Sequence, residues 1–140
     1  GDDMVPLINY TTIGGVPLMD FLKLKKFPYS KIEKIVNRTR MGGGEIVKLL
    51  KRGSAFYAPA SSAIQMAEAF LFDQKKLLPC AAFINGQYGL SNMYMGVPTI
   101  IGKKGIEKII EVKLTSKEKL MLKKSVKSVQ GLVSAVDNLL

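Results

Sequence analysis

The chain has 140 residues, of which 47% are hydrophobic, so it can bury one core of ordinary size. No apolar run reaches the roughly 18 residues that a transmembrane helix needs, and the opening Gly-Asp-Asp does not resemble a signal peptide. The absence of histidine excludes imidazole as a base or metal ligand within the chain. The single cysteine, Cys80, cannot form an internal disulfide, which fits a reducing, cytoplasmic setting.

The formal net charge is +10, and such a balance can mark a nucleic-acid or anionic-surface partner. Here the lysines are dispersed along the chain, and no nucleic-acid motif accompanies them. The pattern therefore favours a solvated surface, with neither nucleic acid nor membrane as partner. An alternative is that a partner segment outside this chain balances the charge.

The first 22 residues predict short, mixed elements. Residues 4–13 are apolar and β-branched enough for a strand, which Pro6 restricts to an edge position or a late start. Gly14 and Gly15 predict a turn. The apolar residues 16–22 that follow do not indicate one type of element.

A long helix is predicted to start at Ser30, with Glu33 completing a capping box. Apolar or small residues recur at helical spacing as far as Leu50, so the helix is expected to continue through the glycines 42–44. Gly43 lies on the predicted buried side, where it would let another backbone approach. Gly53 is expected to end the helix, because glycine adopts positive φ easily.

A short elbow, residues 54–57, separates this helix from a third one expected over residues 59–72. Pro59 suits the first turn of a helix, where its missing N–H is harmless. The elbow can be an ordinary helix–helix corner or a wall presented to a ligand. The predicted core face of the third helix consists of Ala63, Met66, Ala67, Phe70 and Leu71.

Three apolar, β-prone runs then follow, separated by Asn85-Gly86 and by a Lys-Gly turn, and predict an antiparallel meander. Thr115 and Glu118 form a second capping box, which opens a last amphipathic helix. Its apolar stripe is Leu122, Val126, Val129, Val133, Val136 and Leu140. The predicted fold class is α+β, with an antiparallel sheet packed against long helices.

The residues themselves indicate no active site. The glycines 42–44 lie in a helical pattern and do not follow a strand, so they are not a phosphate-binding loop. Asp2 and Asp3 would point to opposite faces of a strand and are a poor acid/base pair. We assign no catalytic residue, no cofactor-binding residue and no metal ligand in this chain.

Four stretches resemble the lactate/malate dehydrogenase family, and in particular its NAD-dependent malate dehydrogenases of the lactate-dehydrogenase-like bacterial branch. They are GDDMVPL (1–7), GGGEIVKLLKRGSAFYAPASSAIQMAEAF (42–70), LPCAAFINGQYG (78–89) and MYMGVPTIIGKKGIEKIIE (93–111). The resemblance covers essentially the whole chain. It implies that residues 1–140 are the C-terminal substrate-binding and oligomerisation domain, without the N-terminal Rossmann domain that binds NAD.

The resemblance further implies a function that this chain cannot perform alone. In the family, the catalytic histidine stands immediately before the Gly-Asp that corresponds to Gly1 and Asp2, and the NAD site and substrate arginines lie further upstream. What remains is substrate pocket wall. By resemblance Ala55 faces the substrate, Pro59 lies near the nicotinamide, and Asp2 and Met4 flank the catalytic position.

The implied reaction is the reversible NAD-dependent oxidation of malate to oxaloacetate in the tricarboxylic acid cycle. The implied partners are this substrate pair, the chain's own Rossmann half and further copies in a dimer or tetramer. The alternatives are a part of a lactate-dehydrogenase-type enzyme, a non-catalytic interaction scaffold and a basic nucleic-acid binder. The apolar faces that would meet a Rossmann domain are expected to be exposed.

Overall fold

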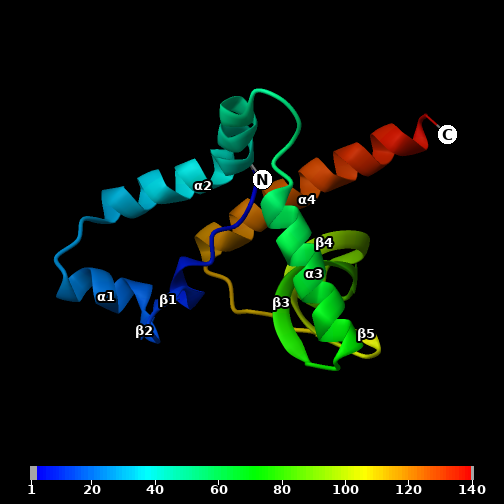
Figure 1. Ribbon diagram of the computed structural model, residues 1–140, viewed down its shortest axis with the longest axis horizontal. Coiled ribbons are helices and arrows are strands. Elements are labelled where there is room, and N and C mark those ends of the chain that lie inside the picture. Colours follow the sequence, from blue (N-terminus) through cyan, green and yellow to red (C-terminus); the bar gives the residue numbers. More distant parts are fainter. Residues whose placement is uncertain (1–2, 140) are drawn as a thin grey trace. The chain divides into compact units, whose positions relative to one another are not determined.

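The computed structural model of the chain describes residues 3–139, which fold into two compact units. The first unit runs up to Ser54 and resumes at Leu114, and the second is Ala55–Lys113. The first unit holds the 3₁₀ turn η1 (Ile8–Tyr10), strands β1 (Thr12–Ile13) and β2 (Val16–Pro17), and helices α1 (Leu18–Leu24), α2 (Tyr29–Leu50) and α4 (Ser116–Asp137). The second holds α3 (Tyr57–Leu71), β3 (Lys76–Asn85), η2 (Gln87–Gly89), β4 (Ser91–Gly102) and β5 (Gly105–Ile109) (Figure 1).

Of the strand expected over residues 4–13, only the last two residues form one, which is the late start that Pro6 allowed. The chain is irregular up to η1, and only two residues on each side of a turn pair as an antiparallel ladder, β1 with β2. The turn at Gly14 and Gly15 is confirmed, with φ of +56° and +83°. Such angles suit glycine, so the sequence located the turn correctly but overestimated the strands beside it.

Helix α2 begins one residue earlier than expected. Its N-cap is Pro28, and no side chain caps the helix, so the predicted capping box of Ser30 and Glu33 is wrong. The reason is positional: Ser30 already lies inside the helix and cannot occupy the cap. The end was also misplaced, because Lys51 adopts the left-handed C-cap conformation and Gly53, at φ +79°, comes two residues later.

The continuity of α2 through the three glycines is confirmed. Figure 1 shows that its axis bends between its first and last turns. Near the glycines, the Thr39 hydroxyl donates to the Ile35 carbonyl at 2.8 Å, a contact that often bends helices. Gly43 is exposed, and outside its own helical turns no atom of the described residues lies within 4 Å of a Cβ built there, so no other backbone of this chain approaches it. The approach of a second subunit's backbone at Gly43 stays a prediction.

Helix α4 opens with the predicted capping box. The Thr115 hydroxyl accepts a hydrogen bond from the Glu118 N–H at 3.2 Å, and the Glu118 carboxylate accepts from the Thr115 N–H at 2.7 Å. Its apolar stripe is buried only in its first half. Val126 is buried, whereas Val133 and Val136 are exposed and Leu140 lies outside the described residues.

The second unit contains the predicted meander. Its strands pair antiparallel in the order β3-β4-β5, which confirms the α+β class. Strand β4 buries every second residue: Met93, Met95, Val97, Thr99 and Ile101. Pro79 is tolerated in β3 because an edge strand can lose a ladder donor.

Helix α3 lies against this sheet, where Ala69 packs with Leu78 and Ile101 (Figure 1). The predicted core face of α3 is wrong. Its five members, Ala63, Met66, Ala67, Phe70 and Leu71, are all exposed. The helix carries small or apolar residues on most of its sides, so periodicity could not identify the buried side. The small side chain of Ala69 lies where α3 comes closest to the sheet.

The connection between β3 and β4 is longer than the two-residue turn that Asn85-Gly86 suggested. Tyr88 lies within it at φ +53°, a conformation that is strained for an aromatic residue. Its N–H donates to the Glu111 carboxylate at 2.6 Å, and its hydroxyl accepts from the Val112 N–H at 2.9 Å. Tyr88 thereby fastens the loop to the segment that follows β5. No helix in residues 3–139 is long and apolar enough to cross a membrane.

Candidate functional site

The elbow places two of the predicted site residues on one turn of the second unit. Ala55 is half-buried, directly before the Phe56 N-cap of α3, and Pro59 is the third residue of that helix. The Phe56 and Tyr57 rings, at the start of α3, contact each other with centroids 4.6 Å apart. Pro59 is exposed in the first helical turn, as its missing N–H permits.

The other two predicted residues belong to the first unit. Met4 is half-buried in irregular chain, and Asp2 lies outside the described residues. The neighbouring Asp3 has a defined role: its carboxylate contacts Lys124 Nζ at 2.7 Å and accepts from Ser128 Oγ at 2.6 Å. The hydrogen bond from Lys124, and to a lesser extent the one from Ser128, lowers the pKa of Asp3, so this carboxylate stays ionised. The two contacts tie the N-terminal segment to α4.

The first unit also contains a polar cavity of about 580 Å³ that sequence reasoning missed. It lies between residues 6–9, the first half of α2 and the first turns of α4. Polar side chains from all three segments line it, together with apolar ones; they include Asn9, Glu33, Asn37, Arg40, Thr115 and Glu118, with Met19, Val36 and Met121.

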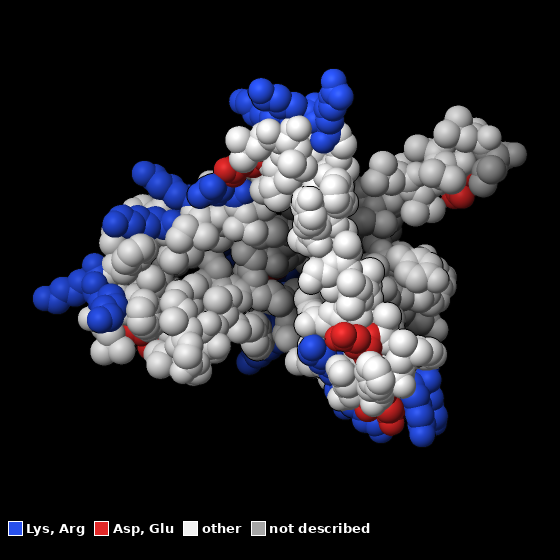
Figure 2. Space-filling model, in the orientation of Figure 1, with Lys and Arg blue, Asp and Glu red and all other residues white. Residues whose placement is uncertain are grey.

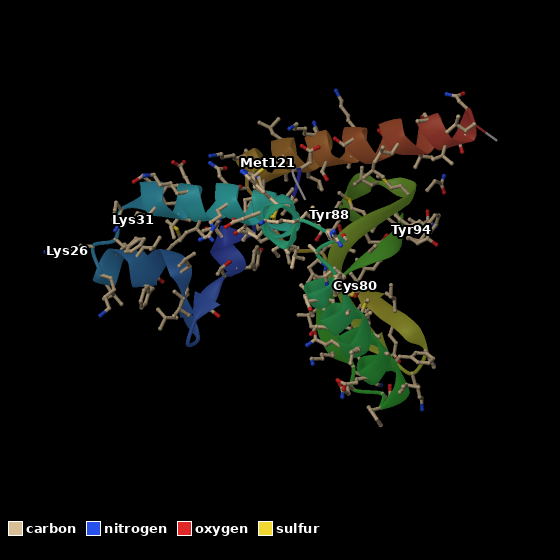
Figure 3. The ribbon with its side chains drawn as sticks, turned by 45° about the horizontal axis from the view of Figure 1, so that its top comes forward. Lys26, Lys31, Cys80, Tyr88, Tyr94 and Met121 are labelled. Atoms are coloured by element: carbon tan, nitrogen blue, oxygen red, sulfur yellow. The ribbon has the colours of Figure 1, made fainter. Side chains whose placement is uncertain are left out.

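Arg40 is the notable member of this lining. Its Nη1 donates to Asn37 Oδ1 at 3.1 Å, and its Nη2 lies 3.8 Å from the Met121 sulfur (Figure 3 labels Met121). Its Nε is buried and has no hydrogen-bond partner among the described residues. A signal was present in the sequence, because Arg40 continues the spacing of Ile32 and Val36 at steps of four and so falls on the inner side of the helix.

Chemistry of other kinds is not evident in the described part of the chain. The glycines 42–44 lie in the middle of α2 and form no loop at a helix start, and residues 3–139 hold no group of three or more potential metal ligands. Figure 2 shows Lys and Arg side chains at several separate places on the visible face.

Comparison with known proteins decides the family. Residues 1–137 match the α/β C-terminal domain of lactate/malate dehydrogenases. The chain belongs to this family. Among curated members of the lactate/malate dehydrogenase family, malate dehydrogenase from Cereibacter sphaeroides is 59% identical over 135 residues, which is 96% of this chain and 42% of that protein. The chain thus spans less than half the length of the curated relatives that it matches.

Solved structures of the lactate/malate dehydrogenase family have the same fold. Malate dehydrogenase from Cryptosporidium parvum superposes with a TM-score of 0.95 at 49% identity, over 99% of this chain and 44% of that one. Lactate dehydrogenase from Eimeria maxima, solved with NADH and oxamate, superposes with a TM-score of 0.94 at 46% identity, over 99% and 43%. Malate dehydrogenase from Salinibacter ruber gives 0.91 at 45% identity, over 99% and 44%. The resemblance stated from the sequence is confirmed.

Proposed function

We propose that this chain is the C-terminal, substrate-binding part of an NAD-dependent malate dehydrogenase, which oxidises malate reversibly to oxaloacetate when joined to its Rossmann half. The observation that carries the proposal is the 59% identity to a malate dehydrogenase over 96% of the chain. The elbow supports it, because a half-buried Ala55 beside two aromatic rings in contact suits a pocket wall.

The proposed reaction moves a hydride to NAD while a base removes the hydroxyl proton of malate. The NAD site, the histidine base and the arginine clamps belong to the other half, by family resemblance. General-base catalysis alone contributes about 10²- to 10⁴-fold, and positioning a dicarboxylate contributes more. This chain by itself is therefore expected to be inactive.

The contribution of this chain is proposed to be shape. Ala55 has a small side chain, which leaves room for the longer dicarboxylate, and Pro59 stands near the nicotinamide on the same turn. Met4 and Asp2 are proposed to flank the catalytic position.

A lactate-dehydrogenase-type reaction is the second candidate. One observation favours it: solved lactate dehydrogenases, such as that of Eimeria maxima, match this chain nearly as well as the malate enzymes do. We place it second because the curated relatives at 59% identity are malate dehydrogenases.

We further propose a cytoplasmic enzyme of the tricarboxylic acid cycle that works as a homo-oligomer. The single cysteine supports a reducing compartment. Large exposed apolar side chains on α2, α3 and α4 support burial against further protein, whether the Rossmann half or other copies.

The deciding experiment is NADH-linked reduction of oxaloacetate, with pyruvate as the competing substrate. The chain is assayed alone and then mixed with, or fused to, the part of the Cereibacter sphaeroides enzyme that it does not match. Activity only in the combined protein supports the proposal, and a preference for pyruvate would favour the lactate alternative. Binding of the two parts without turnover would favour a scaffold. Activity of the chain alone would contradict the assignment of the NAD site, the base and the arginines to the other half.

A further inference from the structure

The N-terminal segment is held to α4 through both oxygens of one carboxylate. Lys124 Nζ lies 2.7 Å from Asp3 Oδ1, and the Ser128 hydroxyl donates to Asp3 Oδ2 at 2.6 Å. Lys124 and Ser128 are four residues apart, so they lie on one face of the helix. Because each oxygen has its own donor, the two contacts fix the orientation of the carboxylate as well as its place.

This tether acts on a stretch of chain that has few other polar contacts. Residues 3–7 form no helix or strand, and residues 3–5 make no main-chain hydrogen bond to another described residue. Met4 and Val5 are half-buried, and apolar packing holds them without the directional preference of a hydrogen bond. The place of this stretch therefore depends on α4, which follows it by more than 100 residues in the chain.

The tether contributes little to stability but can matter for geometry. The Lys124 side chain is 76% exposed, and exposed ion pairs add little to the free energy of unfolding. A reaction rate is far more sensitive to position, because a misplacement of about 1 Å can lower it about 10²-fold. A contact of this kind is thus better suited to placing a segment than to holding the fold together.

We propose that Lys124 and Ser128 are positioning residues, which act through Asp3 to place the catalytic position of the joined enzyme. The inference rests on the proposed function, in which Asp2 and Met4 flank that position. These two residues are the chain neighbours of Asp3, so the tethered carboxylate lies on the same short stretch. Neither Lys124 nor Ser128 has to touch the substrate for this role.

The test measures kcat and KM in the fusion of this chain to the part of the Cereibacter sphaeroides enzyme that it does not match. Lys124→Met combined with Ser128→Ala removes both donors and leaves residues 1–4 unchanged. This double variant is expected to lower kcat about tenfold and to leave KM for NADH unchanged, because the other half is proposed to bind NADH.

Two matched variants accompany it. Lys124→Arg combined with Ser128→Thr keeps both donors and is expected to retain most of the parent's kcat. Lys123→Met removes an exposed lysine of the same helix and is expected to leave kcat unchanged. Loss of kcat in either of these variants, to the extent seen in the double variant without donors, would overturn the proposal.

A second measurement follows the segment itself. Amide exchange of residues 4–11 in the fusion is expected to be faster when both donors are removed, with the urea midpoint nearly unchanged. A loss of kcat that comes with a lowered urea midpoint and no local change in exchange would show general destabilisation and overturn the positioning role.

The outcomes separate this inference from the proposed function. Turnover by the parent fusion, with equal kcat for the variant without donors, would keep the function and overturn the positioning role. A parent fusion that binds NADH but reduces neither oxaloacetate nor pyruvate would overturn the proposed function, and this inference with it.

Discussion

At the scale of single residues, Gly102 is the position where the backbone has least room. A Cβ built on it would lie 2.5 Å from Glu107 Oε1 and 2.7 Å from Asp73 Oδ1. Both carboxylates serve the turn between β4 and β5, because Asp73 accepts from the Lys103 N–H at 2.9 Å and Glu107 accepts from the Lys104 N–H at 3.5 Å. A side chain at Gly102 would therefore displace the two carboxylates that hold the hairpin.

We expect Gly102→Ala to destabilise the chain by about 1–3 kcal/mol, as overpacking at tight sites does. Urea unfolding followed by circular dichroism measures the change. Gly96→Ala on the same strand is the control, because apart from its chain neighbours no atom of residues 3–139 lies within 4 Å of its Cβ position, and the residue is exposed. Equal effects of the two substitutions would show that displacement of the two carboxylates does not set the cost.

Ala55 is the residue that carries the proposed substrate preference. Ala55→Thr adds a methyl and a hydroxyl group to the pocket wall. In the fused enzyme it is expected to shift the ratio of kcat/KM for oxaloacetate over pyruvate about tenfold toward pyruvate, a typical effect of one small group in a pocket. Pro59→Ala is the companion variant, which is expected to leave the ratio nearly unchanged. An unaltered ratio for Ala55→Thr would remove Ala55 from the pocket.

At the scale of elements, the bend of α2 is held by an ion pair that spans the glycines. Arg38 Nε donates to Glu45 Oε2 at 3.1 Å, and Arg38 Nη2 donates to Glu45 Oε1 at 2.8 Å, a bidentate contact seven residues apart. The glycines 42–44 between them weaken the helix by about 1 kcal/mol each relative to alanine. The ion pair thus braces the segment of α2 that has the least intrinsic helical preference.

The hydrogen bonds from Arg38 lower the pKa of Glu45, which gives the brace a pH dependence. A lowered carboxyl pKa adds stability above the unfolded value of about 4.3, and that stability is lost as the pH falls through the lowered folded value. The urea midpoint of Glu45→Gln is therefore expected to lie below that of the parent at pH 7, and the two are expected to converge as the pH falls below about 4.

The effect is expected to be small and to shrink in 0.5 M NaCl, because both side chains are exposed. The control is Asp20→Asn, which removes the exposed ion pair of Asp20 with Lys23 on α1, at 3.6 Å, and spans no glycine. A difference between Glu45→Gln and the parent that persists at pH 3 would mean that the carboxylate does not act through its charge.

At the scale of the whole molecule, the chain combines a large exposed apolar surface with a high positive charge. Leu49, Leu71, Phe72 and Leu132 are each at least 70% exposed, and the net charge is +10. Contiguous exposed apolar surface promotes association, whereas like charge opposes it. Because salt screens the repulsion between like charges, the extent of self-association should depend on the salt concentration.

We expect the chain alone to self-associate more as salt rises, because the Debye length falls from about 30 Å at 0.01 M to about 3 Å at 1 M. Sedimentation velocity in 20 mM and 500 mM NaCl measures this. A monomer at both salt concentrations would indicate that the exposed side chains are too scattered to bind.

The sequence by itself determined the family, the α+β class, the β3-β4-β5 meander, the continuity of α2 and the capping box of α4. The family came from the resemblance of four stretches to known members. The other features depend on local chemistry and short-range spacing, such as Thr115 with Glu118, which a linear pattern records directly. Only the tertiary structure decided which side of α3 is buried, where α2 begins and ends, and that the Nε atom of the half-buried Arg40 is shielded from solvent. Those outcomes depend on which surfaces of distant elements pack together. A helix with apolar residues on several sides can pack in more than one way, and only its neighbours in the fold determine which side is buried.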